Sequence, residues 1–284
     1  DVDMIREAHV GVGIEGVEGC EAVLASDFSI PSFRLLYRLL ILHGRWCANR
    51  CALLVLLTFY KNTMMATLQL LYGIYNGFSA TSCFDSGFFS MYNTILTIPQ
   101  LFFICVLEQD IQSKYAMAIP QVYEETQRTG NLSIGDIIEW YCYSLGHSCM
   151  IFFYSFFENN TILLNEEGVT LDHPLFTQIT GWNLLFVFTI ELLFRFRTLT
   201  WVHVLLYVIC IALYLLIELV YSSADPYYSG IVRLLFTVPR LWLTIPCTLG
   251  AVIAFDLIAQ YLRPIIRPSV TNSVAELEYL SQRW

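Results

Sequence analysis

Residues 51–74, CALLVLLTFYKNTMMATLQLLYGI, decide the fold of this chain. Lys61 is the one charged side chain in this mainly apolar run. About 20 such residues form a helix long enough to cross the hydrocarbon core of a bilayer. Lipid offers no hydrogen-bond partner to the backbone, so a segment that crosses it must be helical. We therefore expect a transmembrane helix that carries a lysine near the middle of the membrane.

Five further stretches of the chain have a similar length and character. They are Phe88–Leu107, Ile137–Phe157, Leu175–Phe194, Trp201–Tyr221 and Leu234–Leu262. The 284 residues are 56% hydrophobic and 14% charged, whereas soluble domains are about 45–50% apolar and about 25% charged. The sequence therefore predicts an all-α polytopic membrane bundle of six transmembrane helices. The net charge of −9 argues against nucleic acid as a partner.

The basic residues predict the orientation of these spans. Most of the 15 lysines and arginines lie before the first span, after the second, after the fourth or in the tail. The loops at 79–87, 158–174 and 222–230 hold none. Because cytosolic loops carry the excess of basic residues, we expect both termini in the cytosol. The glycosylation sequon Asn159-Asn160-Thr161 then lies on the outer side.

The first 31 residues have a different, soluble character. The alternating run His9–Ile14 predicts a short strand, Cys20–Ser26 one or two helical turns, and Asp27–Ile30 another extended piece. Some thirty residues cannot close a core alone, so we expect the last part of an α/β domain. From Ser32 the absence of proline favours one helix to Tyr75. The alternative is a separate surface helix that ends at Gly44.

Several short motifs together resemble one known family. They are Asp1–Ile5, Val10–Gly19, Ala25–Phe28, His43–Trp46, Phe59-Tyr60-Lys61-Asn62, Tyr92-Asn93 and Glu108-Gln109-Asp110. This set resembles the phospholipid-translocating P-type ATPases, or lipid flippases, over essentially the whole chain. Val10–Gly19 and Tyr60-Lys61-Asn62 match flippases rather than ion pumps.

The resemblance implies a domain organisation and cofactors. Residues 1–31 would end the phosphorylation domain, 32–50 form a cytosolic stalk, 51–262 match the fifth to tenth of ten transmembrane helices, and 263–284 form a cytosolic tail. Asp1 would match the last aspartate of the loop that helps to hold Mg²⁺ in the family. The full-length protein would use ATP and Mg²⁺ to move phospholipid from the outer to the cytosolic leaflet. Its membrane would be the plasma membrane or an endomembrane such as Golgi or endosome.

The resemblance also implies an accessory β-subunit with two spans and glycosylation. The phosphorylated aspartate of the family's Asp-Lys-Thr-Gly-Thr motif is not among these 284 residues. We therefore expect the chain to be part of a longer protein and inactive as an ATPase by itself. Two alternatives stay open. One is a truncated, non-catalytic six-span membrane protein, and the other is a six-span channel, which would need an arginine-rich gating helix or a filter loop.

Five residues are candidates for lipid transport: Lys61, Asn62, Tyr92, Asn93 and Pro99. A charge at the bilayer centre costs about 2.5–3.5 kcal/mol on insertion scales and usually faces a bundle interior or a wet cavity. Lys61 is then a cation that senses the lipid phosphate, or else a structural lysine paired with a carboxylate or backbone carbonyls. Asn62 and Asn93 can bond phosphate oxygens or join helices. Pro99 predicts a kink, and Tyr92 lies along the same span.

The carboxylates of the later spans point away from a cation pump. Glu191, Glu218 and Asp256 lie near span ends, and we expect them to be interfacial or paired rather than an ion site. The nine cysteines have no metal-binding spacing.

Overall fold

The computed structural model describes residues 2–16, 20–129, 132–159, 173–198, 200–224, 230, 232–233, 239–266 and 269–281. Asp1 and Asn160-Thr161 of the glycosylation sequon lie outside these residues. The chain forms two compact units. Unit 1 comprises residues 1–49, 110–130 and 270–284, and unit 2 comprises residues 50–109 and 131–269.

The N-terminal part of unit 1 is a small α/β segment. Helix α1 (Val2–Glu7) precedes strand β1 (Val12–Ile14), helix α2 (Glu21–Leu24) and strand β2 (Phe28–Ile30). The strands pair in parallel, with Gly13 opposite Ser29. Gly13 is needed because a Cβ there would lie 2.7 Å from Ser26 Oγ, too close for real atoms. The predicted strand, turn of helix and second extended piece are therefore present in the predicted order.

One uninterrupted helix runs from Leu35 to Tyr75. It consists of α3 (Leu35–Arg38), the π-helical turn η1 (Leu39–Gly44) and α4 (Arg45–Tyr75). A single glycine costs only about 1 kcal/mol in a helix, and the chain passes Gly44 within the wider π turn. The expectation of a continuous helix is confirmed, and the alternative with a break at Gly44 is wrong.

The rest of unit 1 packs short helices against this helix. They are α7 (Ser113–Ala118), α8 (Gln121–Thr129) and α14 (Val270–Ser281). Their shared core contains Leu42, Ile111, Val122 and Val274. Arg45 is 2% exposed and donates two hydrogen bonds to Asp110, at 2.9 and 2.5 Å. The loop after the second predicted span is therefore a folded element held by a buried ion pair.

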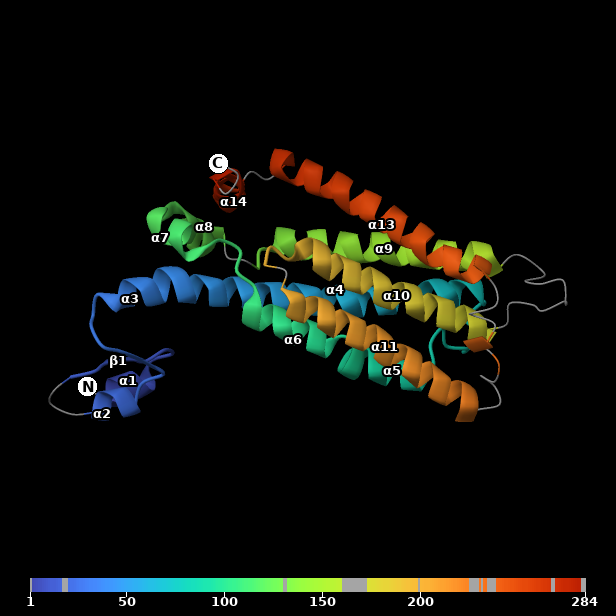
Figure 1. The fold of residues 1–284 in the computed structure, drawn as a ribbon, viewed down its shortest axis with the longest axis horizontal. Helices are drawn as coiled ribbons and strands as arrows, with labels where there is room; N and C mark the ends of the chain where they lie inside the picture. Colours follow the sequence, from blue (N-terminus) through green and yellow to red (C-terminus); the bar gives the residue numbers. More distant parts are fainter. Residues whose placement is uncertain are drawn as a thin grey trace. The chain divides into compact units, whose positions relative to one another are not determined.

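Unit 2 is a bundle of helices (Figure 1). Besides α4, the long ones are α9 (Ile134–Asn159), α10 (His173–Arg195), α11 (Trp201–Ala224) and α13 (Pro239–Ile266). Three shorter pieces follow one another: α5 (Ser86–Met91), η2 (Tyr92–Leu96) and α6 (Ile98–Leu107). Helix α10 packs against α9 and α13, while α11 packs against α6 and η2. The predicted span Phe88–Leu107 is thus present as three consecutive helical pieces.

Five helices of the described chain are long and apolar enough to cross a membrane: Leu35–Tyr75, Gly87–Leu107, His173–Arg195, Trp201–Ser223 and Trp242–Ile266. They correspond to five of the six predicted spans. Helix α9 has 26 residues but carries Ser144, His147 and Ser148 among its apolar residues. These three polar side chains are completely buried inside the bundle. These polar residues lower the hydropathy of α9, and their burial keeps them away from the outer surface of the bundle.

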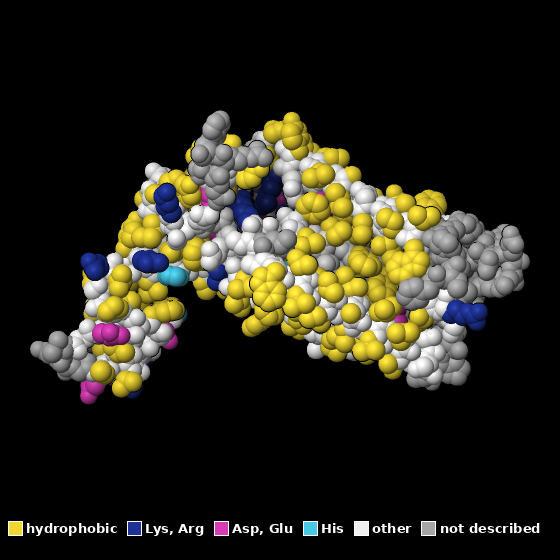
Figure 2. Space-filling view, viewed as in Figure 1, with side chains coloured by type: hydrophobic (Ala, Val, Ile, Leu, Met, Phe, Trp, Pro, Cys, Tyr) yellow, Lys and Arg dark blue, Asp and Glu magenta, His cyan; other side chains and the backbone are white. Residues whose placement is uncertain are grey.

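The surface of the bundle suits a lipid environment. Large hydrophobic side chains such as Phe102, Val208 and Ile258 are more than half exposed. Figure 2 shows hydrophobic side chains over most of the visible face of these helices. A soluble monomer rarely exposes an apolar surface of this extent, so the bundle is built to be covered by lipid or by other helices.

Candidate functional site

Lys61 lies inside the bundle and is 4% exposed. Its ammonium donates to Asn93 Oδ1 at 3.0 Å and to Thr97 Oγ1 at 2.9 Å. The Asn93 carbonyl oxygen is 3.5 Å away, and the Tyr92 ring centroid is 5.8 Å away. All of these acceptors are electrically neutral. The structural alternative was a lysine paired with a carboxylate or with backbone carbonyls. Among the described residues Lys61 has no carboxylate partner, and one backbone carbonyl, that of Asn93, lies at 3.5 Å.

The acceptors of Lys61 come from an interrupted helix. After the π-helical residues Tyr92–Leu96, the helix breaks at Thr97 and restarts at Ile98. Pro99 lacks an N–H and cannot complete the helical hydrogen-bond ladder. The Thr97 hydroxyl donates to the Tyr92 carbonyl at 2.7 Å, and Gln100 Nε2 donates to the Leu96 carbonyl at 3.0 Å. These two side chains stabilise the break within the membrane-spanning segment.

The structure brings together some of the predicted site residues. Lys61 contacts both Tyr92 and Asn93, and Pro99 lies further along the same interrupted helix. Tyr92 is completely buried, and its hydroxyl has no hydrogen-bond partner among the described residues. Asn62 is exposed and does not join this group. Asp1 lies outside the described residues.

Sequence reasoning missed two residues of this site, Thr97 and Gln100. Both are completely buried. The available signal was their position, because polar residues on either side of a proline in an apolar span can bond the freed carbonyls. We refer to Lys61, Tyr92, Asn93, Thr97 and Gln100 as the lysine site.

A second group of polar side chains lies elsewhere in unit 2. Glu191 and Asp256 are 0% and 1% exposed. Glu191 pairs with Arg195 at 2.6 Å, and Asp256 with His147 at 3.1 Å. Glu218, 4% exposed, accepts a hydrogen bond from Trp182 Nε1 at 2.9 Å. These carboxylates were expected to be interfacial or paired. Glu191 and Asp256 pair with Arg195 and His147, Glu218 bonds Trp182, and all three are buried among the helices.

The fold and the lysine site define a multi-pass α-helical membrane protein with a buried cation beside a broken helix. A family model described as "Phospholipid-translocating P-type ATPase C-terminal" matches residues 23–269. The chain belongs to this family.

Individual relatives agree with the family match. "Probable phospholipid-transporting ATPase 5" of Arabidopsis thaliana is 30% identical over 98% of this chain and 23% of its own length. "Phospholipid-transporting ATPase VD" of Mus musculus is 30% identical over 96% of this chain and 19% of its own length. The chain thus spans about a fifth to a quarter of the length of these relatives.

Proposed function

We propose that this chain is the membrane region of an ATP-driven phospholipid flippase, which moves phospholipid from the outer or lumenal leaflet to the cytosolic leaflet. The observation that carries the proposal is the buried Lys61, whose described partners are all neutral oxygens. A desolvated ammonium without a counter-ion is costly. A lipid phosphate is the anion that would relieve this cost during passage.

The lysine site supplies the other groups that a phosphate needs. Thr97 can release Lys61 while retaining a hydrogen bond of its own, because its hydroxyl already donates to the Tyr92 carbonyl. The unpartnered Tyr92 hydroxyl is an additional donor. In our proposal the phosphate oxygens replace the neutral oxygens around Lys61. Asn62, on the exposed side of α4, would contact lipid outside the bundle.

The proposal includes an organisation for the whole protein. In this scheme helix α9 also crosses the membrane, as the third of six spans in chain order, both termini are cytosolic, and residues 1–31 end a phosphorylation domain. The continuous helix Leu35–Tyr75 would carry movement of that domain to Lys61. ATP and Mg²⁺ act in the phosphorylation chemistry, and Asp1 is a suitable carboxylate for Mg²⁺. The accessory β-subunit is part of the same proposal.

A flipping assay tests the function. The whole protein that carries this chain is reconstituted in liposomes with its cytosolic side outward, together with a phospholipid labelled on its acyl chain. We expect ATP, but not ADP, to increase the fraction of label that a membrane-impermeant quencher reaches from outside. An unchanged fraction with ATP, in protein that still forms a phosphoenzyme, would contradict lipid as the cargo.

Cysteine labelling tests the predicted orientation of the spans in the membrane. Glu166, which lies outside the described residues, is placed by the basic-residue distribution in an outer loop. In Glu166→Cys we expect labelling by an impermeant thiol reagent from the non-cytosolic side of sealed vesicles. Glu124→Cys is the matched control, since Glu124 is exposed in the predicted cytosolic segment. Labelling of position 166 only after permeabilisation would show that the orientation is reversed.

A further inference from the structure

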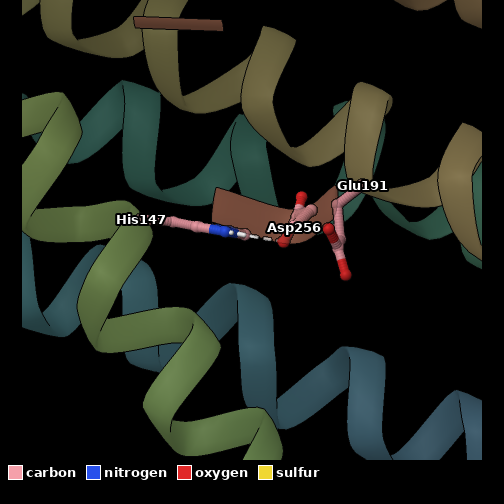
Figure 3. Close-up of side chains that lie close together, drawn as sticks. All are labelled: His147, Glu191 and Asp256. Atoms are coloured by element: carbon pink, nitrogen blue, oxygen red, sulfur yellow. Dashed lines mark hydrogen bonds and ion pairs between the residues drawn. The ribbon is translucent and has the colours of Figure 1, made fainter. Parts of the chain in front are cut away.

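The second polar group of unit 2 joins four helices. Its members are Tyr60 on α4, Tyr143 and His147 on α9, Glu191 and Arg195 on α10, and Asp256 on α13. Single atoms of His147, Glu191 and Asp256 lie within 4.8 Å of one another. Figure 3 shows the carboxyl groups of Glu191 and Asp256 close together, with the His147 ring pointing toward Asp256. We call these six residues the carboxylate cluster.

Hydrogen bonds connect three members of the cluster across three helices. Tyr60 Oη lies 2.6 Å from His147 Nδ1, and His147 Nε2 lies 3.1 Å from Asp256 Oδ1. His147 donates from Nε2 to Asp256 Oδ1, which can accept whether or not the other carboxyl oxygen carries a proton. The remaining ring nitrogen, Nδ1, shares a hydrogen bond with the Tyr60 hydroxyl.

The fixed charges of the cluster do not balance. Glu191 and Asp256 carry two negative charges when ionised, whereas the Arg195 guanidinium carries one positive charge. This guanidinium lies 4.5 Å from the Trp140 ring centroid and 4.6 Å from that of Tyr143. An uncompensated charge in such a dry location costs several kcal/mol. A divalent metal ion would leave the cluster with a net positive charge and would lie beside the Arg195 guanidinium. One proton instead brings the net charge of the cluster to zero.

Two oxygen atoms of the cluster also lack a donor. Glu191 Oε2 and Asp256 Oδ2 are buried and have no hydrogen-bond partner among the described residues. Buried acceptors of this kind are normally satisfied. If one of the two carboxyls is protonated, it becomes a donor to the other. A proton on one carboxyl therefore removes both the charge excess and the missing hydrogen bond, whereas a proton on the His147 ring would remove only the charge excess and leave both oxygens without a donor.

We propose that Glu191 and Asp256 form a binding site for one exchangeable proton in the membrane region. Binding is an acid–base equilibrium in which a proton leaves hydronium and forms one O–H bond on either carboxyl. The site also reaches α4, because Tyr60 directly precedes Lys61 and bonds His147. A displacement of α4 would change the hydrogen bonding of Asp256 through His147. This proposal does not depend on lipid as the cargo.

Infrared spectroscopy of the whole protein in nanodiscs tests the site without ATP or transport. At neutral pH we expect a carbonyl band of a protonated carboxylic acid in the wild type. In difference spectra against the wild type, one such band should be lost in Glu191→Gln and in Asp256→Asn, because either change leaves one carboxylate balanced by Arg195. No band should be lost in Glu139→Gln, the matched control, whose carboxylate lies 3.4 Å from Arg263. Glu218→Gln identifies the separate band of Glu218, which is buried and bonds Trp182.

Thermal unfolding of each variant checks that the bundle has folded. Carboxyl-specific ¹³C labelling of aspartate or glutamate in the wild type gives a second readout that needs no variant, since the isotope shifts the band of the residue that holds the proton. A wild type without this band at neutral pH, or a band that persists in both Glu191→Gln and Asp256→Asn, would overturn the proposal.

Discussion

Replacing Lys61 by alanine in the whole protein is expected to lower lipid-stimulated ATP hydrolysis by about tenfold or more while phosphoenzyme still forms. A hydrogen bond to a charged group is worth about 1.5–3 kcal/mol, and about 1.4 kcal/mol corresponds to a factor of ten. In the proposed function phosphorylation takes place outside the membrane region, whereas Lys61 is enclosed within the bundle. The change should therefore affect the step that responds to lipid. The steady-state rate of ATP hydrolysis is measured as a function of lipid concentration, and the amount of phosphoenzyme is measured in parallel.

Lys114→Ala is the control for the same charge change. Lys114 is the other lysine of the chain and is exposed in unit 1, so lipid stimulation should stay at the wild-type level.

Thr97→Val tests a single contact of the lysine site, because it removes one acceptor of Lys61 and the donor to the Tyr92 carbonyl. We expect an intermediate loss for it, whereas Thr94→Val, at an exposed position nearby, should have little effect. Full lipid stimulation in Lys61→Ala would refute the role of the lysine site.

Arg45→Met is expected to release the segment 110–130 from the long helix. Asp110 would lose both hydrogen bonds from the guanidinium and retain the one from Asn49 at 2.7 Å. Removing one partner of a buried ion pair costs about 3–5 kcal/mol. The side chain of Asp110 is 20% exposed, so the lower figure applies. About 3 kcal/mol corresponds to more than a hundredfold rise in the population of the open segment.

Native-state trypsinolysis measures this opening. Cleavage after Lys114 and Arg128 reports on the segment, and its rate follows the open population when opening and closing are fast. Arg38→Met is the matched control on the same helix, since Arg38 is exposed, and it should change the rate by no more than about twofold. Equal cleavage rates in the two variants would mean that the Arg45–Asp110 pair does not hold the segment.

The long helices could be predicted because their signal is local. A run of apolar residues without proline specifies a helix in lipid whatever its neighbours are, and this reasoning located Leu35–Tyr75 through Gly44. Strand β1 was also foreseeable from alternation, and the interruption near Pro99 from the missing N–H of proline. The parallel pairing of β1 with β2 was not, because it depends on how the chain returns through α2.

The polar interior of the bundle could not be predicted in the same way. Glu191 and Asp256 are 65 residues apart in the chain, and His147 lies on a third helix. Hydropathy gives each of them only a position along a span. Their distance from one another depends on how α9, α10 and α13 rotate and cross. For the same reason sequence reasoning could describe these carboxylates only as interfacial or paired, and packing decides which groups they contact.

The amino-acid sequence alone was sufficient for the membrane class, the approximate spans and the unusual lysine, because each depends on the transfer of single side chains and backbone groups between water and lipid. The tertiary structure decided which oxygens surround Lys61, that Arg45 is buried against Asp110, and that two carboxylates share one enclosed space. These features depend on distances between residues remote in sequence, and helix packing sets those distances.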